Sequence, residues 1–500
     1  MGENHQKSRA GKQKGINMSV QAKSSAELEA SAAAGITAKL AKHAAGLRYE
    51  DLPQPLVDII KQCVMDTLGV SIGASSLSPE ARILADYVTE MGGKPESTIF
   101  GFGGKAPAGW AVFVNGSLGH MLDFDDIGES GHPSIVTIPV AIALAEKIGA
   151  VSGKELITSI AAGMDVMTRI SRAIEVPDWT MTEGWFATQL IGFIAGAATG
   201  GRLLGLDEHQ MENALGIGFN QMSGSRQMAV GAATHMRSMQ AGFSGQGAIL
   251  AAQLAQRGII GSKEVIEGRY GFFRTYIRGN EPDWAGIVDR LGEHFPLIEK
   301  HGFKVWPACA YTRTTNASVM AIMKNQGLKP DDIGAIIIVG GTAGTRLLCE
   351  PIELKRRPKV SIDGKYSIPF TTAVMAAKGN VTLRAYTDEG LRDPVVLAMA
   401  DRVSYRPAEK AATGRGGSAD VSSTSVEIVT RDGRHFEHRS TGVPGDPKNP
   451  VDWDQIEAKF RDCVSFSAKP VSPDSVDKAA GLIRNLDELA DVSSLIRLLG

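Results

Sequence analysis

Carboxylates and imidazoles are concentrated in one stretch of the sequence, residues 115–134. In order they are His120, Asp123, Asp125, Asp126 and His132. An imidazole exchanges its proton near neutral pH, and a carboxylate can act as a base, orient a histidine or hold a water molecule. The combination is suited to moving a proton on and off a small substrate. Any single aspartate here also has a simpler interpretation, because carboxylates at helix ends commonly accept hydrogen bonds from free backbone N–H groups.

These residues lie at a break between two predicted helices. Small and apolar residues predict one helix over Ala106–Met121, and the apolar pattern resumes over Ile135–Ile148. Asp123–His132 is therefore the predicted connecting loop. Gly128 and Gly131 allow positive φ angles in this loop, which would let the backbone approach a ligand closely.

The helical pattern continues over most of the first half of the chain and predicts a large all-helical domain at residues 31–275. The other predicted helices are Ala33–Leu47, Pro53–Gly73, Pro79–Glu90, Gly153–Ser171, Gly184–Leu204, Asp207–Gln221 and Met236–Arg257. Glycine makes up 57 of the 500 residues, and the excess lies inside helical segments such as residues 191–201. Small residues at these positions predict closely packed helices.

A second domain of mixed α+β structure is predicted at residues 285–452, where β-branched residues alternate with helical patterns. The predicted elements in the second half are strands at Ile333–Val339 and Ser425–Val429 and helices at Thr314–Asn325, Ile368–Lys378, Pro394–Ala400, Trp453–Phe466 and Asn485–Leu499. Residues 1–30 carry almost no large apolar side chains, so they are predicted to be a disordered tail.

Composition argues against several classes of function. A net charge of −2 gives no electrostatic footprint for nucleic acid, and no apolar run is long enough to form a membrane helix. Four scattered cysteines and the absence of a signal-peptide pattern predict a cytoplasmic protein without a structural disulfide. The segment Thr98–Gly104 superficially resembles a nucleotide-binding loop, but no βαβ unit surrounds it, so it is predicted to be a turn.

Further motifs make the chain similar to a known family. In family order they are Asn115–Asp126 with His132 and Pro133, Gly184–Thr188, Arg202–Asp207, Arg237–Gly242, Ile266–Phe272, Lys304–Cys309 and Ser367–Phe370. This series resembles the MmgE/PrpD family, whose members include 2-methylcitrate dehydratase, cis-aconitate decarboxylase and iminodisuccinate epimerase. The resemblance implies a mainly α fold with a large helical domain, completed by residues 453–500, and a smaller α+β domain. It also implies a homodimer that acts without a cofactor on small di- or tricarboxylates.

The reactions of this family make or quench an anion at a carbon next to a carboxylate or carbonyl, which requires a base, a proton donor and cations. We predict Asp123, His132 and Lys304 as the catalytic residues. Lys304 begins a motif that resembles the approach of the family's second domain to the active-site cleft. Its alternative interpretation is a solvated surface lysine. The aspartates and histidines do not make a complete ligand set, so no metal is predicted.

The predicted substrate-binding residues are Arg237, Asp126, Phe186, Cys309 and Tyr366. Arg237 stands where many members have lysine, and a guanidinium can bind a carboxylate through two hydrogen bonds. Cys309 stands where some members have histidine, and it is either a packed small hydrophobe or a reactive thiol. Tyr366 and Tyr311 are candidate proton donors.

The chain also departs from the family pattern. Phe186 takes the place of a histidine, Ile127 takes the place of a small hydroxyl residue, and Phe370 stands where some relatives have tyrosine. Two proton-transfer groups are therefore expected to be missing. The pocket is predicted to be more apolar than in the tricarboxylate lyases of the family, which argues against both methylcitrate dehydration and aconitate decarboxylation.

The sequence thus predicts a lyase with its site in the cleft between two domains, and it favours the reversible loss of water from a hydroxy-acid. The alternatives within enzymes are epimerisation or racemisation of a carboxylate substrate, and decarboxylation. A further alternative is a family member that binds a ligand without turnover.

Overall fold

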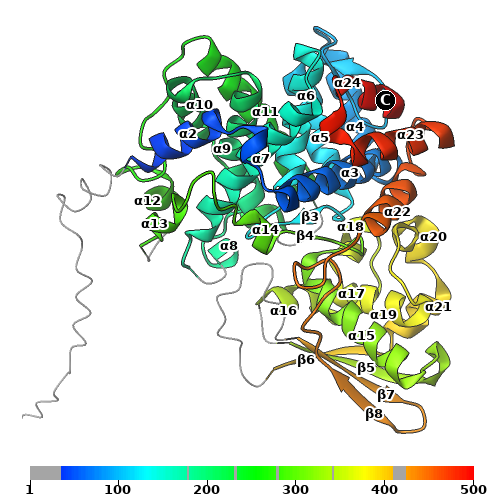
Figure 1. The fold of residues 1–500 in the computed structure, drawn as a ribbon. Coiled ribbons are helices and arrows are strands. Elements are labelled where there is room, and N and C mark those ends of the chain that lie inside the picture. The colour runs from blue at the N-terminus through cyan, green and yellow to red at the C-terminus, as the bar shows by residue number, and fades with distance from the viewer. Residues whose placement is uncertain (1–34, 177–178, 230–233, 278–280, 341–342, 409–423) are drawn as a thin grey trace, which may run out of the picture.

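The computed structural model describes residues 35–176, 179–229, 234–277, 281–340, 343–408 and 424–500. It consists of a larger body built of helices and a smaller body that carries a four-stranded sheet (Figure 1). This is the mainly α fold with a smaller α+β domain that the sequence predicts. The predicted tail at residues 1–30 lies outside the described residues.

Apolar residues at helical spacing form the larger domain. Its main helices are α2 (Ile36–Gly46), α3 (Gln54–Leu77), α4 (Pro79–Met91), α5 (Ala108–Met121), α6 (Ser134–Ile148), α7 (Gly153–Arg172), α9 (Ala187–Leu203), α10 (Glu208–Phe219) and α11 (Met236–Gln256). Shorter ones are α8 (Trp179–Thr182), α12 (Phe272–Tyr276), α13 (Trp284–Ile287) and α14 (Leu297–Lys300). Helices α5, α6 and α9 are buried almost all round, which agrees with their apolar sequences.

Two glycines allow α5 and α11 to approach each other closely. A Cβ atom on Gly242 would lie 2.2 Å from the carbonyl oxygen of Phe113, and one on Gly116 would lie 3.0 Å from the backbone of α11. Side chains at these positions would therefore force the helices apart. Since His120 lies at the end of α5 and Arg237 at the start of α11, this contact sets the separation of two residues of the site.

The smaller domain is built on a sheet with strand order β6-β5-β7-β8. The strands are β5 (Ile333–Gly340), β6 (Val403–Pro407), β7 (Ser425–Thr430) and β8 (His435–His438). β5 is parallel to β6 and antiparallel to β7, and β7 and β8 are antiparallel. The helices are α15 (Arg313–Gln326), α16 (Ala343–Cys349), α17 (Ile352–Arg356), α18 (Ser361–Lys365), α19 (Ile368–Lys378), α20 (Asp388–Leu391) and α21 (Pro394–Ala400). The sequence analysis missed β6 and β8, which are short and carry several polar residues.

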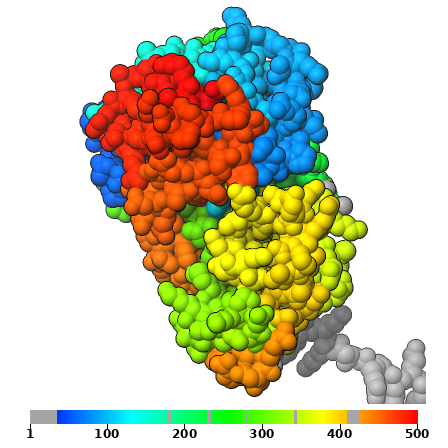
Figure 2. Space-filling model, turned by 90° about the vertical axis from the view of Figure 1, so that its right-hand side faces the viewer, coloured from blue at the N-terminus to red at the C-terminus, as the bar shows by residue number. Residues whose placement is uncertain are grey.

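The last three helices pack on the larger domain, where the red and orange end of the chain covers one face (Figure 2). They are α22 (Trp453–Val464), α23 (Pro473–Arg484) and α24 (Ser493–Leu499). The sequence analysis was wrong about this region, because it missed α23 and predicted one helix over Asn485–Leu499. The missed start signal is a serine cap at Ser472 followed by Pro473 in the first turn.

Two separate hydrophobic cores correspond to the two bodies. Ile287, Phe295 and Phe303 belong to the larger core, whereas Trp306 belongs to the smaller one. By packing, the smaller domain therefore starts near residue 306, and the segment after the predicted boundary at residue 285 buries its apolar side chains in the larger domain.

All four cysteines are buried and free. Within the described part of the chain, no helix has both the length and the apolar character needed to cross a membrane.

Candidate active site

The aspartates of the site lie on the loop after α5, and a short strand pairing holds this loop in place. The strand β3 (Asp126–Ile127) pairs antiparallel with β4 (Gly302–Phe303), although the sequence predicted only a loop here. The pairing brings Lys304, the residue after β4, next to the aspartates. Asp123 has a φ angle of +49°, a left-handed conformation that non-glycine residues rarely adopt and that clusters at functional sites.

Lys304 is fully buried and forms ion pairs with two aspartates. Its Nζ contacts Asp123 and lies 3.3 Å from Oδ1 of Asp125. Burial would raise the pKa of Asp123, but the charge of Lys304 holds it well below its usual value. Burial also opposes ionisation of Asp125. The neighbouring histidines and Lys304 nevertheless hold the pKa of Asp125 well below its usual range. Both carboxylates are therefore charged at neutral pH.

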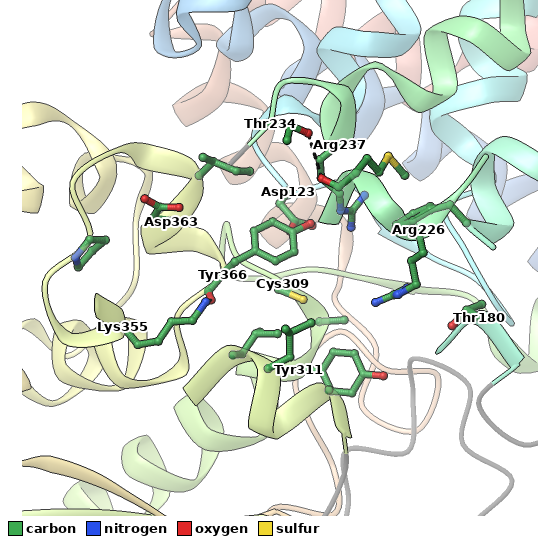
Figure 3. Close-up of a pocket in the computed structure, with 18 of the residues that line it drawn as sticks. Asp123, Thr180, Arg226, Thr234, Arg237, Cys309, Tyr311, Lys355, Asp363 and Tyr366 are labelled. Carbon is green, nitrogen blue, oxygen red and sulfur yellow. Dashed lines mark hydrogen bonds between the residues drawn. The ribbon is translucent and has the colours of Figure 1, made fainter. Parts of the chain in front are cut away.

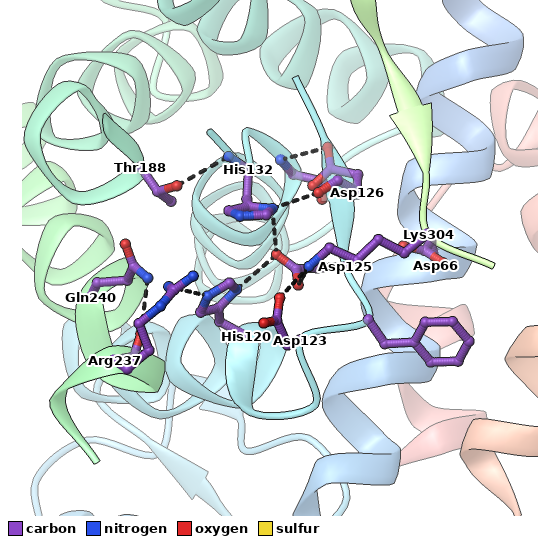
Figure 4. A network of polar contacts seen from close by, with 12 residues as sticks. Asp66, His120, Asp123, Asp125, Asp126, His132, Thr188, Arg237, Gln240 and Lys304 are labelled. Atoms are coloured by element: carbon purple, nitrogen blue, oxygen red, sulfur yellow. Dashed lines mark hydrogen bonds and ion pairs between the residues drawn. The ribbon is translucent and has the colours of Figure 1, made fainter. Parts of the chain in front are cut away.

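His120 is buried between a carboxylate and a guanidinium (Figure 4). Its Nδ1 lies 2.9 Å from Oδ2 of Asp125, and its Nε2 accepts a hydrogen bond from Nη1 of Arg237. Because a guanidinium only donates, Nε2 carries no proton and Nδ1–H donates to Asp125. The pKa of His120 is lowered to about 4, mainly by burial. The charge of Arg237 adds to this lowering, whereas the carboxylate of Asp125 opposes it. His120 is thus a neutral link that orients Arg237.

His132 is held through the same ring atom, Nδ1, by a hydrogen bond to a backbone carbonyl and by an ion-pair contact with a carboxylate. This atom lies 2.6 Å from the carbonyl oxygen of Asp126 and 3.0 Å from Oδ2 of Asp125. It therefore carries the proton, and the lone pair of the neutral ring is on Nε2. The backbone N–H of His132 donates to Oγ1 of Thr188 at 3.0 Å. A histidine fixed in one tautomer by a carboxylate is arranged as a general base.

Arg237 is stacked between two aromatic rings. Its guanidinium carbon lies 4.1 Å from the ring centre of Phe186 and 5.2 Å from that of Tyr366. A second arginine, Arg226, lies 5.5 Å from the same Phe186 ring, and burial followed by the charge of Arg237 lowers its pKa. A guanidinium stacked on its faces presents its edge, which is the part that binds a carboxylate.

The hydroxyl of Tyr366 and the carboxylate of Asp123 lie close together beside Arg237, and both are buried. Burial raises the pKa of Tyr366 well above its usual value, so the hydroxyl stays protonated. Burial also raises the pKa of Cys309, so its thiol is not a nucleophile at neutral pH. A tyrosine hydroxyl and a carboxylate therefore lie next to each other at the cavity wall.

These groups face a cavity of about 660 Å³ between the two domains (Figure 3). The wall includes Asp123, His132 and Arg237 from the larger domain and Cys309, Tyr311 and Tyr366 from the smaller one. The volume is in the range of ligand-binding pockets. The cavity lies between the domains, which is where the sequence analysis placed the site.

Comparison with known proteins assigns the chain to a family. Residues 38–285 match the family model of the MmgE/PrpD N-terminal domain, and residues 306–483 match that of the MmgE/PrpD C-terminal domain. The chain belongs to the MmgE/PrpD family.

Curated relatives include decarboxylases and dehydratases. The chain is 24% identical over 478 residues to the cis-aconitate decarboxylase of Homo sapiens, an alignment that covers 93% of this chain and 94% of that protein. It is 26% identical over 492 residues to the cis-aconitate decarboxylase of Aspergillus terreus, covering 94% of this chain and 97% of that protein. It is also 24% identical over 419 residues to the mitochondrial 2-methylcitrate dehydratase of Yarrowia lipolytica, covering 78% of this chain and 76% of that protein.

The departures from the MmgE/PrpD pattern fall into two groups. Phe186 and Arg237 line the cavity and stack on each other. Ile127, in β3, and Phe370, in the smaller core, are buried and are not among the residues that line the cavity. Phe370 therefore does not itself line this cavity.

Two residues predicted to act on the substrate stand behind the cavity wall instead. Lys304 is enclosed beside Asp123 and does not line the cavity. Asp126, predicted to bind substrate, accepts hydrogen bonds from Nε2 of His301 at 2.9 Å and from the backbone N–H of Ser134 at 3.2 Å. It anchors the loop to the segment before β4 and to the start of α6. Both residues position the site rather than contact the cavity, because the β3–β4 pairing turns them inward.

Sequence reasoning missed Arg226, His301 and Lys365. Nζ of Lys365 donates to the carbonyl oxygen of Met121 at 2.9 Å, and burial lowers the pKa of Lys365 to about 8. Lys365 precedes Tyr366, and His301 lies just before β4, so closeness to recognised motifs was the available signal. Arg226 lies in a segment for which no element was predicted.

Two groups of side chains have the ligand types of a metal site. They are Cys63, Asp126 and His301 in one group and His120, Asp125 and His132 in the other, each with ligand atoms within 4.8 Å of one another. In the first group one nitrogen of His301 contacts both other side chains, and in the second one oxygen of Asp125 contacts both histidines. A metal ion would have to displace these hydrogen bonds.

Proposed function

We propose that the chain is a lyase that removes a proton from the carbon next to a carboxylate of a small di- or tricarboxylate and expels water from the neighbouring carbon. The main support is His132, whose Nδ1 is held by two acceptors while its side chain lines the cavity that Arg237 also lines. A base and a cation are thus combined in one cavity, as proton abstraction next to a carboxylate requires.

In this proposal His132 is the base. Nδ1–H stays bonded to Asp125 and to the carbonyl of Asp126, so the proton from the substrate carbon goes to Nε2. The imidazolium that forms is stabilised by the carboxylate of Asp125, which is already ionised. His120 does not compete for this role, because its Nε2 accepts a hydrogen bond from Arg237 and its low pKa makes it a weak base.

Arg237 binds the carboxylate next to the reacting carbon. One of its nitrogens is held by His120, and its faces are covered by Phe186 and Tyr366, so the remaining N–H groups at its edge are directed by the protein before substrate binds. A second carboxylate is bound by Arg226 on the same side of the cavity. The negative charge that develops on the first carboxylate during proton removal is then met by a fixed cation.

Tyr366 protonates the leaving hydroxyl. Its hydroxyl is protonated at neutral pH and lies beside the carboxylate of Asp123, which would accept a hydrogen bond from the same substrate hydroxyl. One C–H and one C–O bond break, a carbon–carbon double bond forms, and the hydroxide takes the tyrosine proton and leaves as water. The reverse sequence hydrates the double bond.

Decarboxylation of a related acid is a second candidate, supported by the decarboxylase relatives that align over more than 90% of this chain. In that reaction the bond to a carboxylate carbon breaks and carbon dioxide leaves. The remaining carbanion takes a proton from protonated His132.

Proton NMR of a panel of di- and tricarboxylates in D₂O tests the proposal. Deuterium entering the carbon next to a carboxylate, with formation of an unsaturated acid, is the expected result, and carbon dioxide release would identify the second candidate. A ligand that binds, by calorimetry, and shows neither exchange nor conversion would instead indicate binding without turnover.

A further inference from the structure

The cavity is larger than a small tricarboxylate requires. About 660 Å³ holds roughly 20 water-sized groups at the ~30 Å³ that a water molecule occupies in the liquid, whereas a small tricarboxylate has about 13 non-hydrogen atoms. The charged groups that would hold such an acid are concentrated at one part of the wall, around Arg237 and Arg226. The remainder of the volume needs another explanation.

The part of the wall formed by the smaller domain combines apolar side chains with charged ones, which are Glu350, Lys355, Arg357, Lys359 and Asp363. Helices α16 and α17 and the segment after them contribute Leu347, Leu348, Pro351, Leu354, Pro358 and Ile362. Two of these side chains are far more exposed than leucine normally is beside a cavity, 39% for Leu347 and 64% for Leu354. Unburied leucines that face a cavity gain free energy when an apolar ligand covers them.

Two of the charged side chains near these leucines are engaged with the protein. Nζ of Lys355 donates to the carbonyl oxygen of Tyr366 at 2.9 Å, and Arg357 forms an ion pair with Asp401 at 2.7 Å. Figure 3 shows Lys355 and Arg226 at opposite sides of the cavity, with Tyr366 and Cys309 between them. An aliphatic extension of the substrate would meet the leucines at this end, next to Lys359 and Asp363, which also line it.

We infer that the substrate is a carboxylic acid that carries an aliphatic tail of several carbons, with its acid groups at Arg237 and Arg226 and its tail along α16 and α17. This inference rests on the proposed function for the position of the acid groups.

The test compares citrate derivatives and their dehydrated tricarboxylates that carry a linear alkyl tail from none to about six carbons. We expect kcat/KM to rise about fourfold per methylene, because each buried methylene gains transfer free energy. Leu354→Glu and Leu347→Glu should each reduce the ratio of kcat/KM for long-tailed over tail-free acids by about tenfold, since a charge would face the tail. Both leucines are exposed, so the variants should fold.

Leu250→Glu is the matched control, because Leu250 is 50% exposed on α11 and does not line the cavity. It should leave the ratio unchanged. The inference would be overturned if kcat/KM of the wild type did not rise with tail length. It would also be overturned if Leu354→Glu had the same ratio of kcat/KM for long-tailed over tail-free acids as the wild type. If the leucines cover a subunit interface instead, Leu354→Glu will change the elution volume in gel filtration and leave the ratio intact, which also overturns it.

A failure of the proposed function is distinguishable from a failure of this inference. If no acid in the series is converted or exchanges deuterium, the proposed function fails, and calorimetry of the same series then decides the tail site. Affinity that rises with tail length and is reduced in Leu354→Glu supports the inference, and affinity independent of tail length overturns it.

Discussion

The guanidinium of Arg237 lies on the ring of Phe186, 4.1 Å from its centre. By sequence, these residues are two separate departures from the family pattern, one that removes a histidine and one that replaces a lysine. In the structure they form one unit. A planar guanidinium stacks on an aromatic face, whereas an ammonium has no plane, and a histidine here would place a second basic group against Arg237.

Phe186→His alone should therefore fail to produce cis-aconitate or methylcitrate turnover. It should also lower kcat/KM for the acid that the wild type converts by about tenfold, because Arg237 loses its stacking partner. The double variant Phe186→His with Arg237→Lys restores both family residues and should be more active than the product of the single effects. Steady-state kinetics of the four proteins checks this, and strictly multiplicative effects would show that the two residues do not act as a pair.

His132→Gln should lower kcat by roughly 10²-fold or more with little change in KM, because glutamine keeps a hydrogen-bonding group but accepts no proton. The thermal midpoint should change little. His209→Gln is the control, since His209 is exposed on α10. Turnover of His132→Gln equal to that of the control would remove His132 from the mechanism.

Lys304→Met should destabilise the larger domain by about 3–5 kcal/mol, because Asp123 and Asp125 would remain buried without their cation. Adding Asp123→Asn should recover part of the loss, since one buried charge is then removed. The urea midpoint of unfolding measures both effects, with Lys300→Met at an exposed position as control. A loss below about 1 kcal/mol would mean that Lys304 is solvated rather than buried.

The pKa of His120 gives the stability a defined pH dependence. The ordinary value is about 6.5 and the folded value about 4, so between these pH values the unfolded chain binds a proton that the folded chain does not. The contribution of His120 to the free energy of unfolding is fully present above about pH 6.5. It falls by up to about 3 kcal/mol as the pH falls toward 4.

Burial raises the pKa of Asp66 to about 6, which acts in the opposite direction over part of this range. The measurement is therefore the difference in unfolding free energy between the wild type and His120→Asn, in which Asp66 contributes equally. We expect the advantage of the wild type to shrink between pH 6.5 and 4. A difference that is constant with pH would show that His120 titrates normally.

Local patterns were sufficient for much of this molecule. Helices such as α5 and α6 were predicted because their apolar residues are continuous, and Asp123 and His132 attracted attention because both lie in the loop between these helices. Local patterns could not show which side chains face the cavity. That depends on the pairing of β3 with β4, which joins segments far apart in the chain and turns Asp126 and Lys304 inward. The stacking of Phe186 on Arg237 likewise required the fold.

The role of Arg237 can be tested through the substrate as well as the protein. Arg237→Met should raise the activation free energy that corresponds to kcat/KM by roughly 2–4 kcal/mol, because a carboxylate in the cavity loses its charge-assisted hydrogen bonds. Methionine retains most of the stem volume and packs well on the Phe186 ring, so unfolding is not the expected cause. Arg257→Met, at an exposed position after α11, should have no effect.

A substrate analogue in which the carboxylate next to the reacting carbon is replaced by an amide completes the cycle. The wild type should convert the acid about 10²-fold faster than the amide, whereas Arg237→Met should convert the two at similar rates, because the discriminating cation is gone. Equal losses for acid and amide in the variant would mean that Arg237 acts through His120 and the packing of Phe186. The carboxylate-binding role would then belong to Arg226, which Arg226→Met with the same two compounds would reveal.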